Sequence, residues 1–243
     1  SCFDDKQAIA FRDSLKGKEK KGSRNPISLS YCYDILRYLR KFFEWLAQQP
    51  KSKINATHIG YLNLSRKESQ IATRARTVDA PTFEEVLQVL ESINGETEVE
   101  KRDKALIALT LLTGARISAI ASLRMKSFDK RRLILEQDPA SGVKTKFSKM
   151  ITTALFPMPD PKPLTYFLEW FDYLEQTRKF SSDDPLFPAT KLEQGKENIS
   201  YYSSGVVEPI FWSNASPARK IFEKRFKGAG IPYFHPHTFR HLI

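Results

Sequence analysis

The sequence predicts a mainly helical protein of two units, an all-α unit followed by a larger unit that contains a small β-sheet. Several long segments repeat apolar residues every three or four positions, as amphipathic helices do. One segment alternates apolar and polar residues instead, which is typical of short strands. Hydrophobic residues make up 41% of the 243 residues, enough for buried cores. No apolar run approaches the length that spans a bilayer, so we expect no association with membranes.

Residues 1–65 are expected to form the all-α unit. Its clearest helix follows Ser28 or Ser30, either of which can cap it, and stops before Pro50. The apolar stripe of this helix consists of Leu29, Cys32, Leu36, Leu39, Phe43 and Leu46. Residues 66–80 contain few large apolar side chains, and we interpret them as an extended basic linker.

Residues 81–243 are expected to form the larger unit. Thr82 and Glu85 have the spacing of a capping box and begin its first helix. Residues 101–129 predict a buried helix, a break at Gly114 and a second helix. Residues 131–157 alternate around a Ser-Gly turn and predict a β-hairpin or a three-stranded sheet. Two further helices are predicted at residues 161–180 and 213–231.

The charge of the chain indicates an anionic partner, most simply nucleic acid. The formal net charge is +11, and it is uneven. Residues 1–80 carry 16 Lys and Arg against 8 Asp and Glu, so the first third of the chain holds most of the excess positive charge.

Cys2 and Cys32 are the only cysteines. So few cysteines argue against a disulfide framework and are consistent with a reducing cytoplasm, where we expect the protein.

Three short clusters could carry chemistry. Arg116 follows the glycine break in "TGARISAI", and lysines 144, 146 and 149 lie in the expected hairpin. The last cluster, "HPHTFRH", holds His235, His237, Arg240 and His241. Each alone has an ordinary explanation: an arginine at a helix end, a solvated strand edge or a polar cluster. A zinc site is not expected, because the histidines are two and four residues apart, Pro236 interrupts them and no cysteine or carboxylate is near.

A phosphate-binding site explains the three clusters together. His237 and Arg240 are three residues apart, so on a helix they share one face. The planar donors of an arginine match two phosphate oxygens, and Arg116 could clamp the same phosphate. A lysine on a flexible hairpin could approach from a third side and donate a proton. Such a set suits metal-free phosphoryl transfer, because it neutralises charge that develops on the phosphate.

The order and spacing of "TGARISAIASLRMKSFD", the lysine hairpin, "DDPLFPA" and "HPHTFRH" resemble those of the tyrosine recombinases, the phage-integrase family. The resemblance covers most of the chain. It implies that residues 1–65 form a helical core-binding domain of SAM-like fold. It also implies that residues 81–243 form a mixed α/β catalytic domain that lacks its C-terminal part.

The resemblance also implies an activity and roles for residues. Arg116 matches the first catalytic arginine, and His237 and Arg240 match the family's H-x-x-R motif. Lys144 matches the hairpin lysine, with Lys146 as the alternative. In the family, a tyrosine attacks a DNA phosphodiester to give a 3′-phosphotyrosine, and a second strand reverses the step without ATP, metal or cofactor.

The partners implied are double-stranded DNA and a homotetramer assembled on paired DNA sites. Phosphate contacts are expected to supply most of the affinity, which should fall with salt. The expected DNA contacts are Arg37, Arg40 and Lys41 on the helix of the first unit, Arg74 and Arg76 in the linker, and Lys146 in the hairpin.

Two features depart from the family pattern. Ala119 lies where the family has an acidic residue, three places after the first arginine. Tyr201, Tyr202 and Tyr233 precede the H-x-x-R motif, whereas the family's nucleophile follows it. We therefore expect this 243-residue chain to bind DNA but not to cleave it by itself.

Two alternatives are a DNA-binding protein of the same fold without catalysis and a type IB topoisomerase. The compact length and "HTFRH" fit the integrase pattern better than the topoisomerase.

Overall fold

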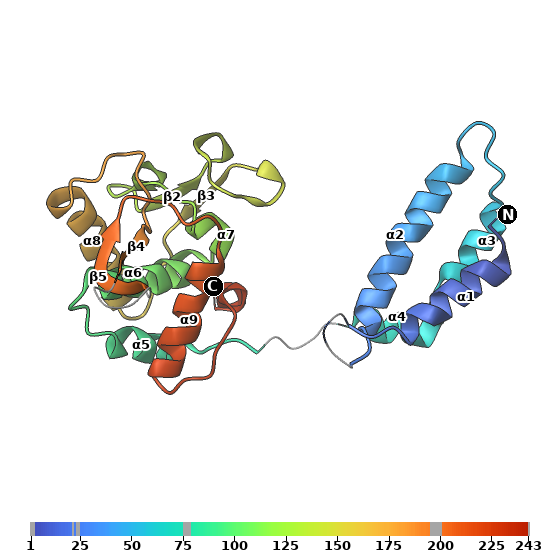
Figure 1. Cartoon of the computed structure of the whole chain (residues 1–243), viewed down its shortest axis with the longest axis horizontal. Coiled ribbons are helices and arrows are strands. Elements are labelled where there is room, and N and C mark those ends of the chain that lie inside the picture. Colours follow the sequence, from blue (N-terminus) through green and yellow to red (C-terminus); the bar gives the residue numbers. More distant parts are fainter. Residues whose placement is uncertain (1–2, 21, 23–24, 75–78, 195–200, 243) are drawn as a thin grey trace. The chain divides into compact units, whose positions relative to one another are not determined.

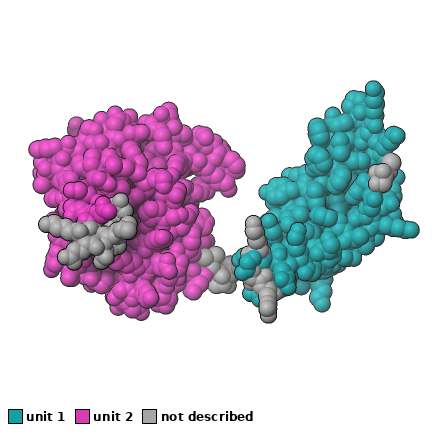
Figure 2. Space-filling model, viewed as in Figure 1, with its two compact units in different colours: residues 1–77 teal, residues 78–243 magenta. Residues whose placement is uncertain are grey.

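The chain forms two units, residues 1–77 and residues 78–243, each with its own hydrophobic core (Figure 2). The computed structural model describes residues 3–20, 22, 25–74, 79–194 and 201–242. Within these ranges, no helix has the length and apolar character needed to cross a membrane.

The regular elements described in the first unit are all helices, as the sequence predicts. Its elements are α1 (Asp5–Lys16), α2 (Leu29–Ala47), α3 (Ala56–Ile59), the 3-10 turn η1 (Gly60–Leu62) and α4 (Arg66–Thr73). Ser28 caps α2 by accepting a hydrogen bond from the Tyr31 amide. The core of this unit is small and includes Ala8, Leu15, Cys32, Leu36, Ile59, Leu62, Leu64 and Ala72.

The expectation of an extended linker over residues 66–80 is wrong for its first half, which is helix α4. Ser65 and Glu68 form a capping box that the low hydrophobicity of the segment conceals. Hydrogen bonds from Lys16 and from Ser65 lower the pKa of Glu68 to about 2. Ala72 is buried, and the Ser30 hydroxyl donates to its carbonyl at 2.7 Å, so α4 packs with α2.

The second unit is built around one buried helix, α6 (Glu98–Thr113), which lies in its middle (Figure 1). Around it lie α5 (Phe83–Ser92), α8 (Lys162–Asp172), which a π turn η5 (Tyr173–Thr177) extends, and α9 (Ser216–Gly228). The Thr82–Glu85 capping box of α5 is present as the sequence predicts. Because α6 is surrounded, residues 105–113 are all buried, and the helix serves as the axis of the unit.

Two small antiparallel sheets complete the unit. The predicted three-stranded sheet is confirmed, with β1 (Phe128–Asp129), β2 (Ile134–Gln137) and β3 (Ile151–Ala154) in that order. Short 3-10 turns η2 (Met125–Ser127), η3 (Pro139–Ser141) and η4 (Lys146–Ser148) flank it. A second sheet of β4 (Ala189–Gln194) and β5 (Tyr201–Glu208) was not predicted, because the β4 segment is mostly polar.

A buried ion network joins α6 to α9. The Asp103 carboxylate lies between two guanidinium groups: Arg102 donates to it at 2.8 Å and Arg225 of α9 at 2.9 Å. Arg102 also donates to the Pro188 carbonyl and the Thr190 hydroxyl of the β4 region. The Asp103 side chain is only 3% exposed. This network therefore fixes α9 and β4 against the central helix.

Candidate functional site

Arg116 is placed by the break that the sequence predicts at the end of α6. Gly114 adopts the left-handed conformation with φ of 55°, and its amide donates to the Thr110 carbonyl at 2.9 Å. The chain then turns, and Arg116 is the N-cap of the short helix α7 (Ile117–Ile120). Ala119, three residues later, is buried, so its position supplies no acidic partner. In the described part of the chain, the half-buried Arg116 guanidinium forms no ion pair and no hydrogen bond.

His237 and Arg240 lie on the 3-10 helix η6 (Pro236–His241), which packs against α6. Phe239 anchors η6, because it is fully buried against the rings of Phe222 and Phe226 of α9. A 3-10 helix has three residues per turn, so His237 and Arg240 stack on one side of it. Both side chains are exposed, and among the described residues the Arg240 side chain has no ion-pair partner.

The pKa of His237 shows that these residues share one electrostatic environment. Although its side chain reaches the surface, partial burial of the ring lowers the pKa, and the positive charges of Arg240 and Arg116 lower it further. The charges of Arg116 and Arg240 therefore both act on His237. Among the described residues neither arginine has a carboxylate partner, and such a basic site favours an anion.

Lys144 lies between β2 and β3 and is held beside α7. Its backbone amide donates to the Ser122 hydroxyl at 2.8 Å, and its ammonium group donates to the Ser213 carbonyl at 3.3 Å. Ser122 itself donates to the Ser118 and Ala119 carbonyls, so it ties the lysine segment to α7. No hydrogen bond joins Lys144 to Arg116, His237 or Arg240 within the described ranges. Lys144 thus flanks α7, and its hydrogen bonds among the described residues are to Ser122 and Ser213.

Arg124 holds the segment that precedes Lys144. Its Nε donates to the Ser141 carbonyl at 2.6 Å, and its Nη1 donates to the Asp183 carbonyl at 2.6 Å. Its guanidinium group also lies over the Phe211 ring, 4.9 Å from the centroid. Sequence reasoning missed both Ser122 and Arg124, because nothing in "ASLR" distinguishes a residue that supports a distant loop from an ordinary helix end.

His235 caps η6, and its Nδ1 accepts a hydrogen bond from the His237 amide at 3.2 Å. In the part of the chain that the structure describes, no three His, Cys, Asp or Glu side chains gather in a group that could hold a metal ion.

The expected DNA-contacting residues have different surroundings. On α2, Arg37 and Arg40 are half-buried and Lys41 is exposed. Arg37 forms an ion pair with Asp34 at 3.0 Å, which offsets part of its charge. Arg74 is exposed immediately after α4, and Lys146 is exposed with its ammonium over the Phe147 ring. Arg76 lies outside the described residues, so its contacts are not assigned.

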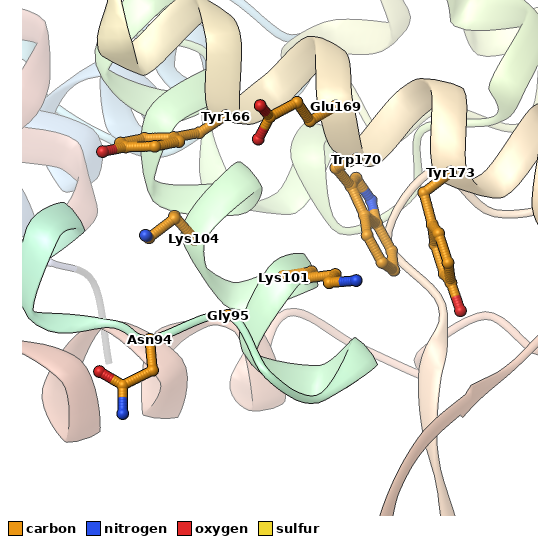
Figure 3. A pocket seen from close by; sticks show the side chains of 8 residues that line it. All are labelled: Asn94, Gly95, Lys101, Lys104, Tyr166, Glu169, Trp170 and Tyr173. Atoms are coloured by element: carbon orange, nitrogen blue, oxygen red, sulfur yellow. The ribbon is translucent and has the colours of Figure 1, made fainter.

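Another cleft lies at the opposite end of α6, lined by Lys101, Lys104, Tyr166 and Tyr173 (Figure 3). At a rise of about 1.5 Å per residue, it is on the order of 15 Å along the helix from the Gly114 turn. Burial raises the pKa of Tyr166 and of Tyr173, and the Tyr173 hydroxyl donates to Glu98 at 2.6 Å. Neither tyrosine is placed or activated to react at the basic site.

Comparisons with known proteins identify relatives of this chain. The sequence model of the Phage integrase family matches residues 80–243. A probable integrase/recombinase of Aquifex aeolicus (strain VF5) is 27% identical over 199 residues, which are 76% of this chain and 57% of that protein. The chain therefore spans little more than half the length of this curated relative.

Solved structures share the fold of the chain. The lambda integrase dimer bound to a COC′ core site has a TM-score of 0.58 at 11% identity, covering 98% of this chain and 69% of that one. The Tn1549 transposon integrase in complex with a circular intermediate DNA has a TM-score of 0.54 at 12% identity, covering 99% and 71%. At such identities, the likeness establishes a common fold.

Proposed function

Because the chain belongs to the Phage integrase family, the tyrosine recombinases, we propose that it carries the DNA-binding and phosphate-activating parts of a site-specific recombinase. The reaction would cut and rejoin DNA through a 3′-phosphotyrosine intermediate. One observation supports this most: the positive charges of Arg116 and Arg240 both lower the pKa of His237, and within the described residues neither guanidinium group has a carboxylate partner. Residues 1–65 would act as the core-binding domain and residues 81–243 as the catalytic domain.

Arg116 and Arg240 would hold the two non-bridging oxygens of the scissile phosphate. During attack, negative charge grows on these oxygens, and fixed guanidinium groups stabilise that charge without reorganising. Because neither side chain has an ion-pair partner among the described residues, neither must break such a pair before it binds the phosphate. The site would therefore be arranged for the transition state in advance.

Lys144 and His237 would handle protons. The attacking tyrosine oxygen forms the new P–O bond, and the 5′ oxygen of the downstream nucleotide leaves with the electron pair of the broken bond. Lys144 would donate a proton to that oxygen as general acid. The lowered pKa of His237 favours its neutral ring, which can accept a proton from the nucleophile. All nine tyrosines of the sequence precede His237, so none of them follows the H-x-x-R motif as the family's nucleophile does.

The basic residues outside the site would bind the DNA duplex. Arg37, Arg40 and Lys41 on α2, Arg74 and Arg76 beyond α4, and Lys146 beside β3 are the proposed backbone contacts. Such contacts release counterions and supply affinity without reading sequence. Because Arg37 already pairs with Asp34, it is expected to contribute less than Arg40 or Lys41.

Assembly on DNA would require several copies. One solved structure with this fold, at a TM-score of 0.55, is a lambda integrase tetramer bound to a Holliday junction. We propose a comparable homotetramer on paired DNA sites for this protein, because strand exchange between two duplexes needs four cuts.

A second candidate function is DNA binding without catalysis. The observation that favours it is the buried Ala119, which supplies no carboxylate to orient Arg116. In that case the cluster would only hold a phosphate.

A covalent capture experiment tests the proposed function. The full gene product would be incubated with sheared genomic DNA of the source organism, and the mixture denatured in detergent. We expect protein–DNA adducts that survive denaturation, carry the protein on a 3′ end and enrich one sequence. Stable binding without any adduct would contradict the recombinase proposal and support the non-catalytic candidate.

Replacing Lys144 with alanine is expected to slow cleavage of the captured sequence by about a hundredfold, the usual contribution of a general acid. A substrate whose leaving oxygen is replaced by sulfur needs little protonation, because a thiol is far more acidic than an alcohol. The Lys144→Ala defect should therefore largely disappear with the sulfur substrate. Lys224→Ala, at an exposed lysine of α9, serves as the control. If Lys146→Ala shows this behaviour instead, Lys146 is the acid.

A further inference from the structure

A cleft of about 300 Å³ lies between the end of α7, the Lys144 segment and the beginning of α9. It does not belong to the cluster of Arg116, His237 and Arg240. Its polar lining consists of Ser118, Ser122, Lys144, Asn214, Ser216 and Arg219. Sequence analysis assigned no role to Arg219, which occupies the first turn of α9.

The charge of this cleft is entirely positive. Lys144 and Arg219 are its two ionised residues, and no carboxylate lines it. Arg219 is exposed, and within the described ranges its guanidinium group has neither an ion-pair partner nor a hydrogen bond. Glu223, one turn further along α9, makes no ion pair with it among the described residues. Two cations beside hydroxyl and amide donors favour an anion with several oxygens.

The position of the cleft indicates which anion it would hold. It contains Lys144, the proposed general acid, and Ser118, two residues after Arg116. A DNA strand carries one phosphate for every 3.4 Å of helix axis. A strand whose scissile phosphate lies between Arg116 and Arg240 therefore presents neighbouring phosphates to this side of α7.

We propose that this cleft is a second phosphate subsite, in which Arg219 binds a backbone phosphate flanking the scissile one on the same DNA strand. The inference rests on the proposed function, since it places the flanking phosphate relative to Arg116 and Lys144. Binding at two phosphates would fix the position of the DNA strand relative to Lys144, because the strand could no longer slide past it. A base contact by Arg219 is the rival interpretation, but base edges carry no net charge to match two cations.

Paired substitutions in protein and DNA test the subsite. In DNA of the captured sequence, a methylphosphonate removes the charge of one phosphate at a time. We expect one flanking methylphosphonate to weaken binding of the unchanged gene product by about tenfold, as loss of a charge-assisted hydrogen bond does. Arg219→Ala should weaken binding to unmodified DNA by a similar factor, and the same methylphosphonate should then have no further effect.

Lys224→Ala is the matched control, because it removes one positive charge from the exposed surface of α9 outside the cleft. It should leave the effect of every methylphosphonate unchanged. On a duplex of arbitrary sequence, Arg219→Ala should also reduce the slope of log affinity against log salt by about one, and more than Lys224→Ala does. This second measurement needs no recombination site.

Two results would overturn the inference. One is that Arg219→Ala matches Lys224→Ala in both the methylphosphonate series and the salt slope. The other is that the Arg219→Ala loss depends on the identity of a single base pair, which would make Arg219 a base reader. Neither result bears on covalent adduct formation. The opposite outcome is also informative. If the gene product binds DNA, and Arg219→Ala still reduces the salt slope, but no adduct forms, only the recombinase chemistry is refuted.

Discussion

Arg116→Ala is expected to slow strand cleavage by about a thousandfold, because a positioned arginine that neutralises phosphoryl charge contributes on that order. Arg116 is half-buried beside His237, and its guanidinium group has no protein partner within the described ranges. Its removal therefore breaks no hydrogen bond or ion pair among the described residues. The rate of adduct formation on the captured DNA, under conditions that saturate binding, measures the effect.

Two further measurements separate a catalytic role from a structural one. Arg116→Lys should recover little of the rate, because an ammonium group lacks the planar pair of donors. A methylphosphonate at the scissile position develops less negative charge, so the Arg116→Ala defect should shrink on that substrate. Arg131→Ala, at an exposed arginine of the β1–β2 turn, should leave the rate unchanged. An equal loss in Arg116→Ala on both substrates would argue against charge stabilisation.

The pH profile of the same variant has a predictable direction. The positive charge of Arg116 contributes to lowering the pKa of His237, so the ring stays neutral down to a lower pH. If neutral His237 is required, activity is lost as the pH falls through that pKa. Arg116→Ala removes one cause of the lowering, so the acidic limb of the profile should move to higher pH.

The second large effect concerns stability: Asp103→Asn is expected to reduce the free energy of unfolding by roughly 3–5 kcal/mol. The carboxylate is 3% exposed and accepts from both Arg102 and Arg225. Asparagine keeps the shape but not the charge, so the buried Arg102 loses its counter-ion and Arg225 keeps only the Glu100 carboxylate, 3.7 Å from its Nη1. For a protein of this size, the melting temperature of the second unit should fall by roughly 10 °C.

An exposed ion pair provides the control for this change. Asp172 pairs with Lys130 at the surface, with 34% of the aspartate side chain exposed. Asp172→Asn should cost no more than about 1 kcal/mol, because exposed pairs contribute little. Chemical denaturation of both variants measures the difference. Equal losses in the two variants would show that the Asp103 network does not hold α9 to α6.

Much of the fold could be predicted from local sequence signals. The Ser28 cap, the Thr82–Glu85 capping box and the alternating residues 131–157 each specify an element through neighbours in the chain, and each is present. The α4 helix was missed because its Ser65–Glu68 box begins a segment with little hydrophobic character. The β4–β5 sheet was missed because the β4 segment is mostly polar and lacks the alternation of a half-buried strand.

The candidate site was predictable only in part. Arg116, His237 and Arg240 stand out because a glycine break and an H-x-x-R motif mark them. Ser122, Arg124 and Arg219 do not, because their significance arises from segments 17 or more residues away that fold against them. The Ser122 hydroxyl accepts a hydrogen bond from the Lys144 amide. The Arg124 guanidinium group donates to two carbonyl groups that are distant in sequence, so no local pattern marks this residue.

The turn at Gly114 restricts how this protein can vary. A β-carbon at a left-handed φ of 55° costs roughly 1–2 kcal/mol. The codon for this residue is therefore constrained by backbone geometry, whereas the codons for Arg116 and Arg240 would be constrained by charge. Among substitutions, asparagine is the least costly, since it tolerates this conformation best after glycine. A β-branched residue would redirect the chain before Arg116 and misplace a guanidinium group that is itself unaltered.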